Sequence, residues 1–195
     1  MVRSKRMILI GSSGQNTGKT TLVKAFIKVW KGRFPIAVLK ITSIAEAGVL
    51  CCRGGCGCGA CGNLGNLPFI LAEERGEAPE KDTGALLDAG ADHVFWLRSL
   101  YSALAEGYSA FLEKIPKDAL IFCESNSLRE VVHPGCFIML INSAHPAMKP
   151  TAARVLALAD MVVQNTRRPE DLERIVLRIQ VKHDPAGDLR VSLGC

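Results

Sequence analysis

The chain has 195 residues, of which 48% are hydrophobic and 22% charged, and its formal net charge is +5. This is enough chain for one large globular domain. The densest basic run, Arg3 to Arg6, contains no aromatic residues, so nothing specific supports nucleic-acid binding. No apolar stretch is long enough to span a bilayer, and we therefore expect a cytoplasmic protein with reduced thiols and no membrane partner.

Short apolar runs alternate with segments of helical period along the chain. We expect strands near residues 7–11, 36–41, 93–97, 119–123, 136–141 and 161–164, and helices at 19–31, 82–89, 99–115, 150–158 and 169–181. A short helix is also expected at Leu67–Arg75, and a turn and a final strand after His183. The alternation predicts an α/β fold with a mostly parallel sheet covered by helices on both faces. Ligands of such folds bind at the carboxyl ends of the strands, which here follow Ile10, Leu39, Cys123 and Val163.

The first predicted strand leads into a glycine-rich turn and then into Gly18-Lys19-Thr20-Thr21. This layout is typical of a P-loop, whose backbone N–H groups and helix dipole hold phosphate. We expect Lys19 to reach the terminal phosphates and the Thr20 hydroxyl to bind Mg²⁺. Ser13 departs from the G-x-x-x-x-G-K-[ST] pattern, because it takes the place of the first glycine. The predicted nucleotide-binding residues of the loop are Gly14, Gln15, Asn16, Thr17, Gly18, Lys19, Thr20 and Thr21.

Four polar residues outside the loop fall where a Mg²⁺-nucleotide site needs them. Lys40 ends the second strand, where it either stabilises charge that develops during the reaction or is an ordinary solvated lysine. Glu124 follows the apolar run 119–123 in a Walker-B-like arrangement, and Asp82 is either a second Mg²⁺ ligand or a helix N-cap. Asn165 is the candidate for binding the base, and the absence of an Asn-Lys-x-Asp motif leaves ATP and GTP both open. The predicted catalytic residues are Lys19, Lys40, Asp82 and Glu124, with Thr20, Asp82 and Glu124 on Mg²⁺.

Residues 42–81 interrupt the predicted fold with a cysteine- and glycine-rich insertion. Its five thiols are Cys51, Cys52, Cys56, Cys58 and Cys61. Thiolates in such glycine-rich surroundings suit an Fe–S cluster or a structural Zn²⁺, and a redox or metal-transfer loop without a stable metal is the third interpretation. Cys123 and Cys136 lie in apolar runs and are expected to be small core residues.

Several of these motifs occur in a characteristic order. The loop Gly14–Thr21, Lys40, the segment Lys81-Asp82-Thr83 leading to Asp88-Ala89-Gly90-Ala91, and Glu124 follow one another between Met7 and Ser127. This series resembles the family of molybdopterin-guanine dinucleotide biosynthesis protein B, in the P-loop group that also holds dethiobiotin synthetase and nickel-insertion GTPases. Two features depart from the family: Ile41-Thr42 and the cysteine insertion replace its His-rich residues, and Ser125-Asn126-Ser127 follows the acid where the family has glycine.

The resemblance implies one P-loop NTPase domain, which we expect to cover residues 1–195, and the cysteines indicate that 42–81 is a metal-binding insertion within it. We expect slow hydrolysis of ATP or GTP with Mg²⁺. Together with an Fe–S or Zn²⁺ centre, this activity would assist assembly or delivery of a molybdenum or tungsten pterin cofactor to a client metalloenzyme, with a homodimer as one possible assembly. Two alternatives remain open. One is a ligase or kinase like dethiobiotin synthetase, in which Ser125, Asn126 and Ser127 contact the substrate, and the other is a zinc-stapled nucleotide-sensing adaptor.

Overall fold

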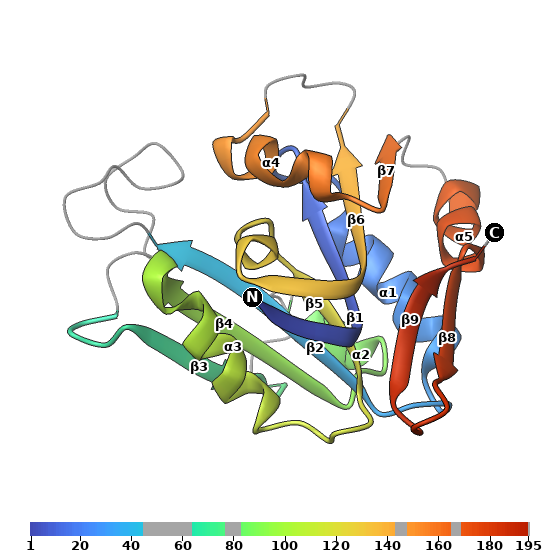
Figure 1. The fold of residues 1–195 in the computed structure, drawn as a ribbon, viewed down its shortest axis with the longest axis horizontal. Coiled ribbons are helices and arrows are strands. Elements are labelled where there is room, and N and C mark those ends of the chain that lie inside the picture. Colours follow the sequence, from blue (N-terminus) through green and yellow to red (C-terminus); the bar gives the residue numbers. More distant parts are fainter. Residues whose placement is uncertain (45–63, 77–82, 143–147, 165–168, 195) are drawn as a thin grey trace.

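The computed structural model describes residues 1–44, 64–76, 83–142, 148–164 and 169–194. Its main elements form one layered α/β unit, drawn in Figure 1. In chain order they are β1 (Val2–Ser12), α1 (Lys19–Trp30), β2 (Ile36–Ile44), β3 (Phe69–Glu73), α2 (Gly84–Asp88), β4 (His93–Leu100), η1 (Tyr101–Ala103), α3 (Leu104–Leu112), β5 (Leu120–Glu124), η2 (Ser127–Glu130), β6 (Val132–Ile141), α4 (Pro150–Val155), η3 (Leu156–Leu158), β7 (Met161–Gln164), α5 (Pro169–Leu177), β8 (Ile179–His183) and β9 (Leu189–Leu193).

Seven of the strands form one sheet in the order β3-β4-β2-β5-β1-β6-β7. Every neighbouring pair is parallel except β3 and β4, which run antiparallel at one edge. The mostly parallel sheet that the sequence predicts is therefore confirmed. β1 is an inner strand of the sheet and is buried along most of its length because β5 and β6 flank it and helices cover both of its faces.

Helices cover both faces of the sheet, and the side chains alternate between two cores. Ile8 and Ile10 of β1 belong to the core under α1, α2 and α5, whereas Met7 and Leu9 belong to the core under α3. Figure 1 shows α3 in front of β3 and β4, with α1 behind the sheet. We call the side covered by α1 the α1 face. On that face Phe26 of α1 stacks on Phe122 of β5, with ring centroids 5.6 Å apart.

The prediction of a short helix at Leu67–Arg75 is wrong, because this segment forms β3. Its register with β4 runs from Phe69 opposite Ser99 to Glu73 opposite Phe95. Phe69 and Leu71 alternate with Ile70, so that the first two pack against the core under α3. An apolar segment this short has little helical stability of its own, and pairing with β4 decides its conformation.

The predicted helix at 169–181 is also only partly right. It ends at Leu177, and Ile179–His183 forms β8, which pairs antiparallel with β9. The turn between them has Gly187 at a φ of 84° and a hydrogen bond from Gly187 N to Asp184 O of 2.8 Å. The predicted turn and final strand are thus confirmed. The predicted helix at 99–115 is shorter too, since β4 continues to Leu100 and α3 covers Leu104–Leu112.

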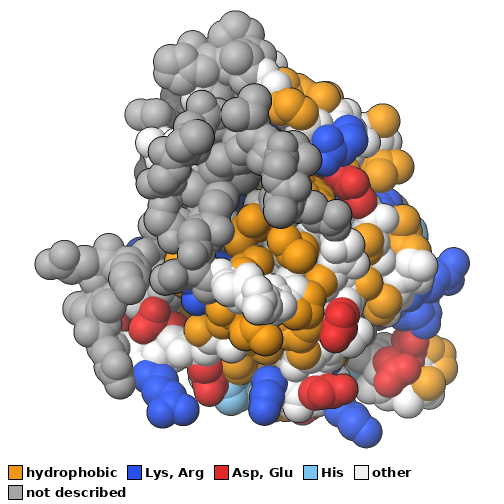
Figure 2. All heavy atoms as spheres, turned by 90° about the vertical axis from the view of Figure 1, so that its left-hand side faces the viewer, with side chains coloured by type: hydrophobic (Ala, Val, Ile, Leu, Met, Phe, Trp, Pro, Cys, Tyr) orange, Lys and Arg blue, Asp and Glu red, His pale blue; other side chains and the backbone are white. Residues whose placement is uncertain are grey.

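The surface on the side of β3 and α3 mixes apolar and charged groups. Hydrophobic side chains gather in its centre, and Lys, Arg, Asp and Glu side chains lie along the border (Figure 2). Leu67, two residues before β3 begins, is 57% exposed. Within the described ranges, no helix combines the length and the apolar character needed to cross a membrane.

Candidate functional site

The glycine-rich loop, residues 11–18, connects the end of β1 to the start of α1. Asn16 and Gly18 have positive φ values of 53° and 85°, and Gly18 caps α1. Asparagine and glycine are the residues that adopt this left-handed conformation most readily. The Lys19 Nζ donates a 2.8 Å hydrogen bond to Ser12 Oγ, which in turn donates to Gly14 O at 2.8 Å. The lysine side chain therefore folds back across the loop.

Ser13, the departure from the P-loop pattern, is anchored on three sides. Its N–H donates to Leu140 O at 2.9 Å, its carbonyl accepts from Lys149 N at 3.0 Å, and its Oγ accepts from Asn142 N at 2.9 Å. Only 2% of the residue is exposed. Since the φ of Ser13 is not positive, this position does not require glycine, and the serine hydroxyl instead ties the loop to the end of β6.

Asn126 holds the other side of the loop. Its Oδ1 accepts from Ser12 N at 2.8 Å, and its Nδ2 donates to Ser12 O at 3.0 Å and to Thr151 Oγ1 at 3.3 Å. The approach is so close that a Cβ on Gly11 would lie 2.7 Å from Asn126 Oδ1. Asn126 is therefore a positioning residue for the loop, a role that the sequence reasoning missed. Its sequence signal was an amide two residues after the end of the buried strand β5.

Glu124 and Lys40 are brought together by the strand order. Glu124 ends β5 and is in register with Ile10 of β1 on one side and with Lys40 of β2 on the other. Residues in register on parallel strands share a face, at a spacing of about 4.8 Å between strands. Ile10 lies in the core under α1, so Glu124 and Lys40 also point to the α1 face, where Lys19 begins the helix. Glu124 is 5% exposed.

The neighbouring thiol, Cys123, lies on the opposite face and is fully buried. Burial raises its pKa well above the ordinary value, and the negative charge of Glu124 raises it further. Cys136 is likewise buried, so both described cysteines are core residues, as expected. The five thiols of the insertion, Cys51, Cys52, Cys56, Cys58 and Cys61, lie outside the described residues, as do Asp82 and Asn165.

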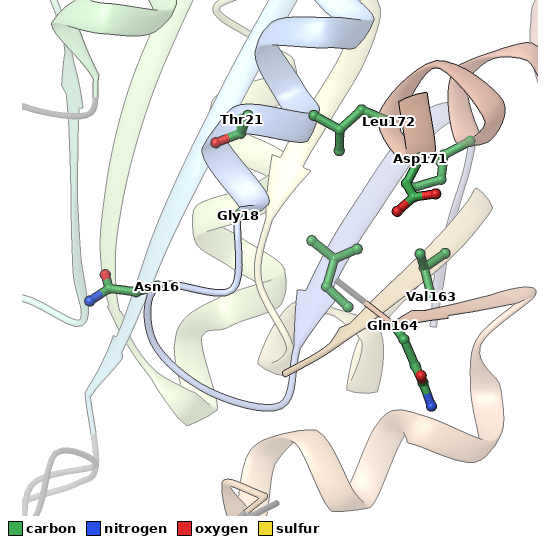
Figure 3. Close-up of a pocket in the computed structure, with 9 residues that line it drawn as sticks. Asn16, Gly18, Thr21, Val163, Gln164, Asp171 and Leu172 are labelled. Carbon is green, nitrogen blue, oxygen red and sulfur yellow. The ribbon is translucent and has the colours of Figure 1, made fainter. Parts of the chain in front are cut away.

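A pocket of about 270 Å³ opens on the α1 face beside the loop. Figure 3 shows Leu172 of α5 reaching toward the first turn of α1, while the Asn16 side chain points away from Val163 and Gln164. Sequence reasoning missed Gln164, Asp171 and Leu172, since only the fold brings β7 and α5 beside α1. The lining residues are Asn16, Gly18, Thr21, Leu140, Val163, Gln164, Asp171, Leu172 and Ile175.

The loop thus has a pocket on its β6–β7 side and an acid–base pair on its β5–β2 side. The Thr20 hydroxyl and the Glu124 carboxylate are hard oxygen donors, which fit Mg²⁺. Magnesium at nucleotide sites takes one or two protein oxygens and fills its shell with phosphate oxygens and water. The described donor set therefore suits a metal that arrives with a nucleotide. Gln15, Thr17 and Gly14 lie in the same loop, with Gln15 and Asn16 exposed and Thr17 buried.

Comparison of the chain with protein-family models, with curated proteins and with solved structures gave no match.

Proposed function

We propose that the chain is a P-loop protein that binds ATP or GTP with Mg²⁺ and hydrolyses the nucleotide slowly. The observation that carries the proposal is the loop itself: a left-handed Gly18 at the start of α1, with Lys19 folded back onto Ser12 at 2.8 Å. Backbone N–H groups at a helix N-terminus attract phosphate, and a lysine at this position supplies the charge that the terminal phosphates need.

The surroundings of the loop supply the remaining parts of a nucleotide site. The pocket lined by Val163, Asp171 and Leu172 lies on one side of α1, and in this proposal it holds the nucleoside. On the other side, Glu124 and Lys40 lie in register at the carboxyl end of the sheet. A triphosphate lying in the loop would extend toward them. Phosphoryl transfer needs mainly positioning and charge neutralisation, and in this proposal Lys19, Lys40 and Glu124 provide both.

Replacement of Lys19 tests the proposal. In Lys19→Ala we expect nucleotide-dependent phosphate release to fall by at least 100-fold, because the charge on the terminal phosphates is lost. Lys28→Ala is the matched control, since this exposed lysine lies on the same helix, about 13 Å along its axis. Equal rates in Lys19→Ala and Lys28→Ala would refute the assignment. Titration with ATP and with GTP then identifies the preferred base.

We further propose that nucleotide turnover assists delivery or assembly of a metal cofactor, with molybdenum and tungsten enzymes as clients. The sequence of the insertion supports this, because five cysteines between Cys51 and Cys61 form a donor set for soft metals. Anaerobic purification followed by metal analysis tests it. Iron with charge-transfer absorbance supports an Fe–S centre, colourless protein with one equivalent of zinc supports the adaptor interpretation, and metal-free protein contradicts a stable centre.

A further inference from the structure

Arg98 of β4 lies on top of an aromatic side chain that is itself held in place. Its guanidinium carbon is 5.0 Å from the centroid of the Trp96 ring. The indole Nε1 of Trp96 donates a 3.0 Å hydrogen bond to Thr42 Oγ1 of β2. Two neighbouring strands therefore fix the platform on which the guanidinium rests. We call Thr42, Trp96 and Arg98 the Arg98 cluster.

Stacking on Trp96 leaves the edge of the guanidinium available for hydrogen bonds. Stacking uses the face of the group, whereas its five N–H donors point outward in the plane. The Arg98 Nε is closed off from solvent and has no hydrogen-bond partner among the residues that the structure describes. A buried donor left in this way costs free energy, so the described residues do not satisfy the whole guanidinium, and an oxyanion would have to bind the outer N–H groups of this half-buried residue.

The Arg98 cluster lies next to the proposed nucleotide site. Thr42 pairs with Arg98 and Lys40 with Trp96 in the β2–β4 register, and Val94 places this row on the α1 face. Arg98 is two strands away from Glu124 and two residues further toward the carboxyl ends. The two Cα atoms are therefore about 12 Å apart. A small molecule bound at Arg98 could therefore reach the terminal phosphate.

We propose that the Arg98 cluster binds the oxyanion, carboxylate or phosphate, of a small second substrate beside the terminal phosphate of the nucleotide. The inference rests on the proposed nucleotide site at Lys19. Arginine matches both oxyanions through two parallel N–H bonds, and Trp96 restricts the guanidinium to one plane. In the ligase or kinase alternative that the sequence left open, Arg98 rather than Asn126 would contact the acceptor.

Trp96 makes the proposal measurable by fluorescence. The full chain is titrated with inorganic phosphate and, separately, with succinate at millimolar concentrations, and Trp96→Phe assigns the signal against the buried Trp30. We expect Arg98→Gln to weaken the response at least 10-fold and Arg98→Lys to weaken it less, because the lysine keeps the charge but not the planar fork. Thermal unfolding of both variants shows that they are folded.

Inorganic phosphate also suits the P-loop, so Lys19→Ala is the matched control. The expected result is an unchanged Trp96 response in Lys19→Ala. If the response is lost in Lys19→Ala but unchanged in Arg98→Gln, the anion binds in the loop and the proposal is wrong. The absence of any Trp96 response to either anion would also overturn the proposal. A response to succinate alone identifies a carboxylate substrate, and a response to phosphate alone identifies a phosphorylated one. Failure of the wild-type chain to bind ATP or GTP would refute the nucleotide site but leave the anion response as a separate result.

Discussion

At the residue scale, the positions of the loop differ in what they require of the backbone. Gly18 needs its left-handed φ of 85°, whereas Gly14 has no positive φ and no atom within 4 Å of the place a Cβ would occupy. Ser13 is fixed by three hydrogen bonds from its backbone and hydroxyl. The glycine-rich loop therefore contains a glycine whose backbone conformation requires glycine, Gly18, and another, Gly14, whose backbone conformation does not.

The two glycines predict opposite results on substitution. In Gly18→Ala the new Cβ is strained because this position has a left-handed φ. We therefore expect a loss of about 1–2 kcal/mol in the free energy of unfolding, together with weaker nucleotide binding. Gly14→Ala is expected to leave stability unchanged or to raise it by about 0.5 kcal/mol, because the unfolded chain loses freedom. Chemical denaturation and nucleotide titration of both variants check this. Equal losses in the two would contradict the backbone argument.

At the element scale, the order of the strands builds the proposed site on one face. β1 lies between β5 and β6, so the loop that follows it has Glu124 and Lys40 on one side and the pocket on the other. Glu124, Lys40 and the pocket residues of β7 and α5 are far from the loop in sequence, and the parallel sheet brings them next to it. The pocket itself needs four elements, since α1, β6, β7 and α5 each contribute to its lining.

The pocket predicts a contrast between two neighbouring valines of β7. Val163 lines the pocket, while Val162 is 55% exposed and is not among the lining residues. Val163→Phe adds bulk where the nucleoside is proposed to lie, and we expect nucleotide affinity to fall at least 10-fold, about 1.4 kcal/mol. Inorganic pyrophosphate, which needs only the loop, should bind as before. Val162→Phe is the control, and an equal loss of ATP or GTP affinity there would show that the pocket is not the nucleoside site.

At the scale of the whole molecule, the sequence was informative where local pattern decides structure. Apolar runs such as Met7–Gly11 predicted strands, and Glu124 was expected at a strand end. β3 was missed because pairing with β4, not propensity, makes it a strand. Asp171 and Arg98 were missed for a related reason: one lines a pocket with a distant helix, and the other stacks on a neighbour two residues away in an ordinary strand. Such roles depend on tertiary neighbours, which a single sequence does not display.

The buried thiols and the buried tyrosine hydroxyl of the two cores make the stability of the whole fold sensitive to high pH. Burial, with the charge of Asp160 as a smaller cause, raises the pKa of Cys136 from about 9 to about 12. Burial also raises the pKa values of Cys123 and of Tyr108, whose hydroxyl donates to Ser4 Oγ at 2.7 Å. In each case the folded state holds its proton to a higher pH than the unfolded chain does.

Stability should therefore be constant with respect to these groups below pH 9 and fall as the pH rises from 9 toward 12, because only the unfolded state releases its protons in that window. For Cys136 alone, the expected loss at pH 10.5 is about 2 kcal/mol. Urea unfolding under reducing conditions at pH 7, 9 and 10.5 measures it. Cys136→Ala is less stable at pH 7, because the smaller side chain leaves a cavity in the core. It should nevertheless lose about 2 kcal/mol less than the wild-type chain between pH 7 and 10.5, and an identical loss in the two proteins would show that this thiol does not control the alkaline transition.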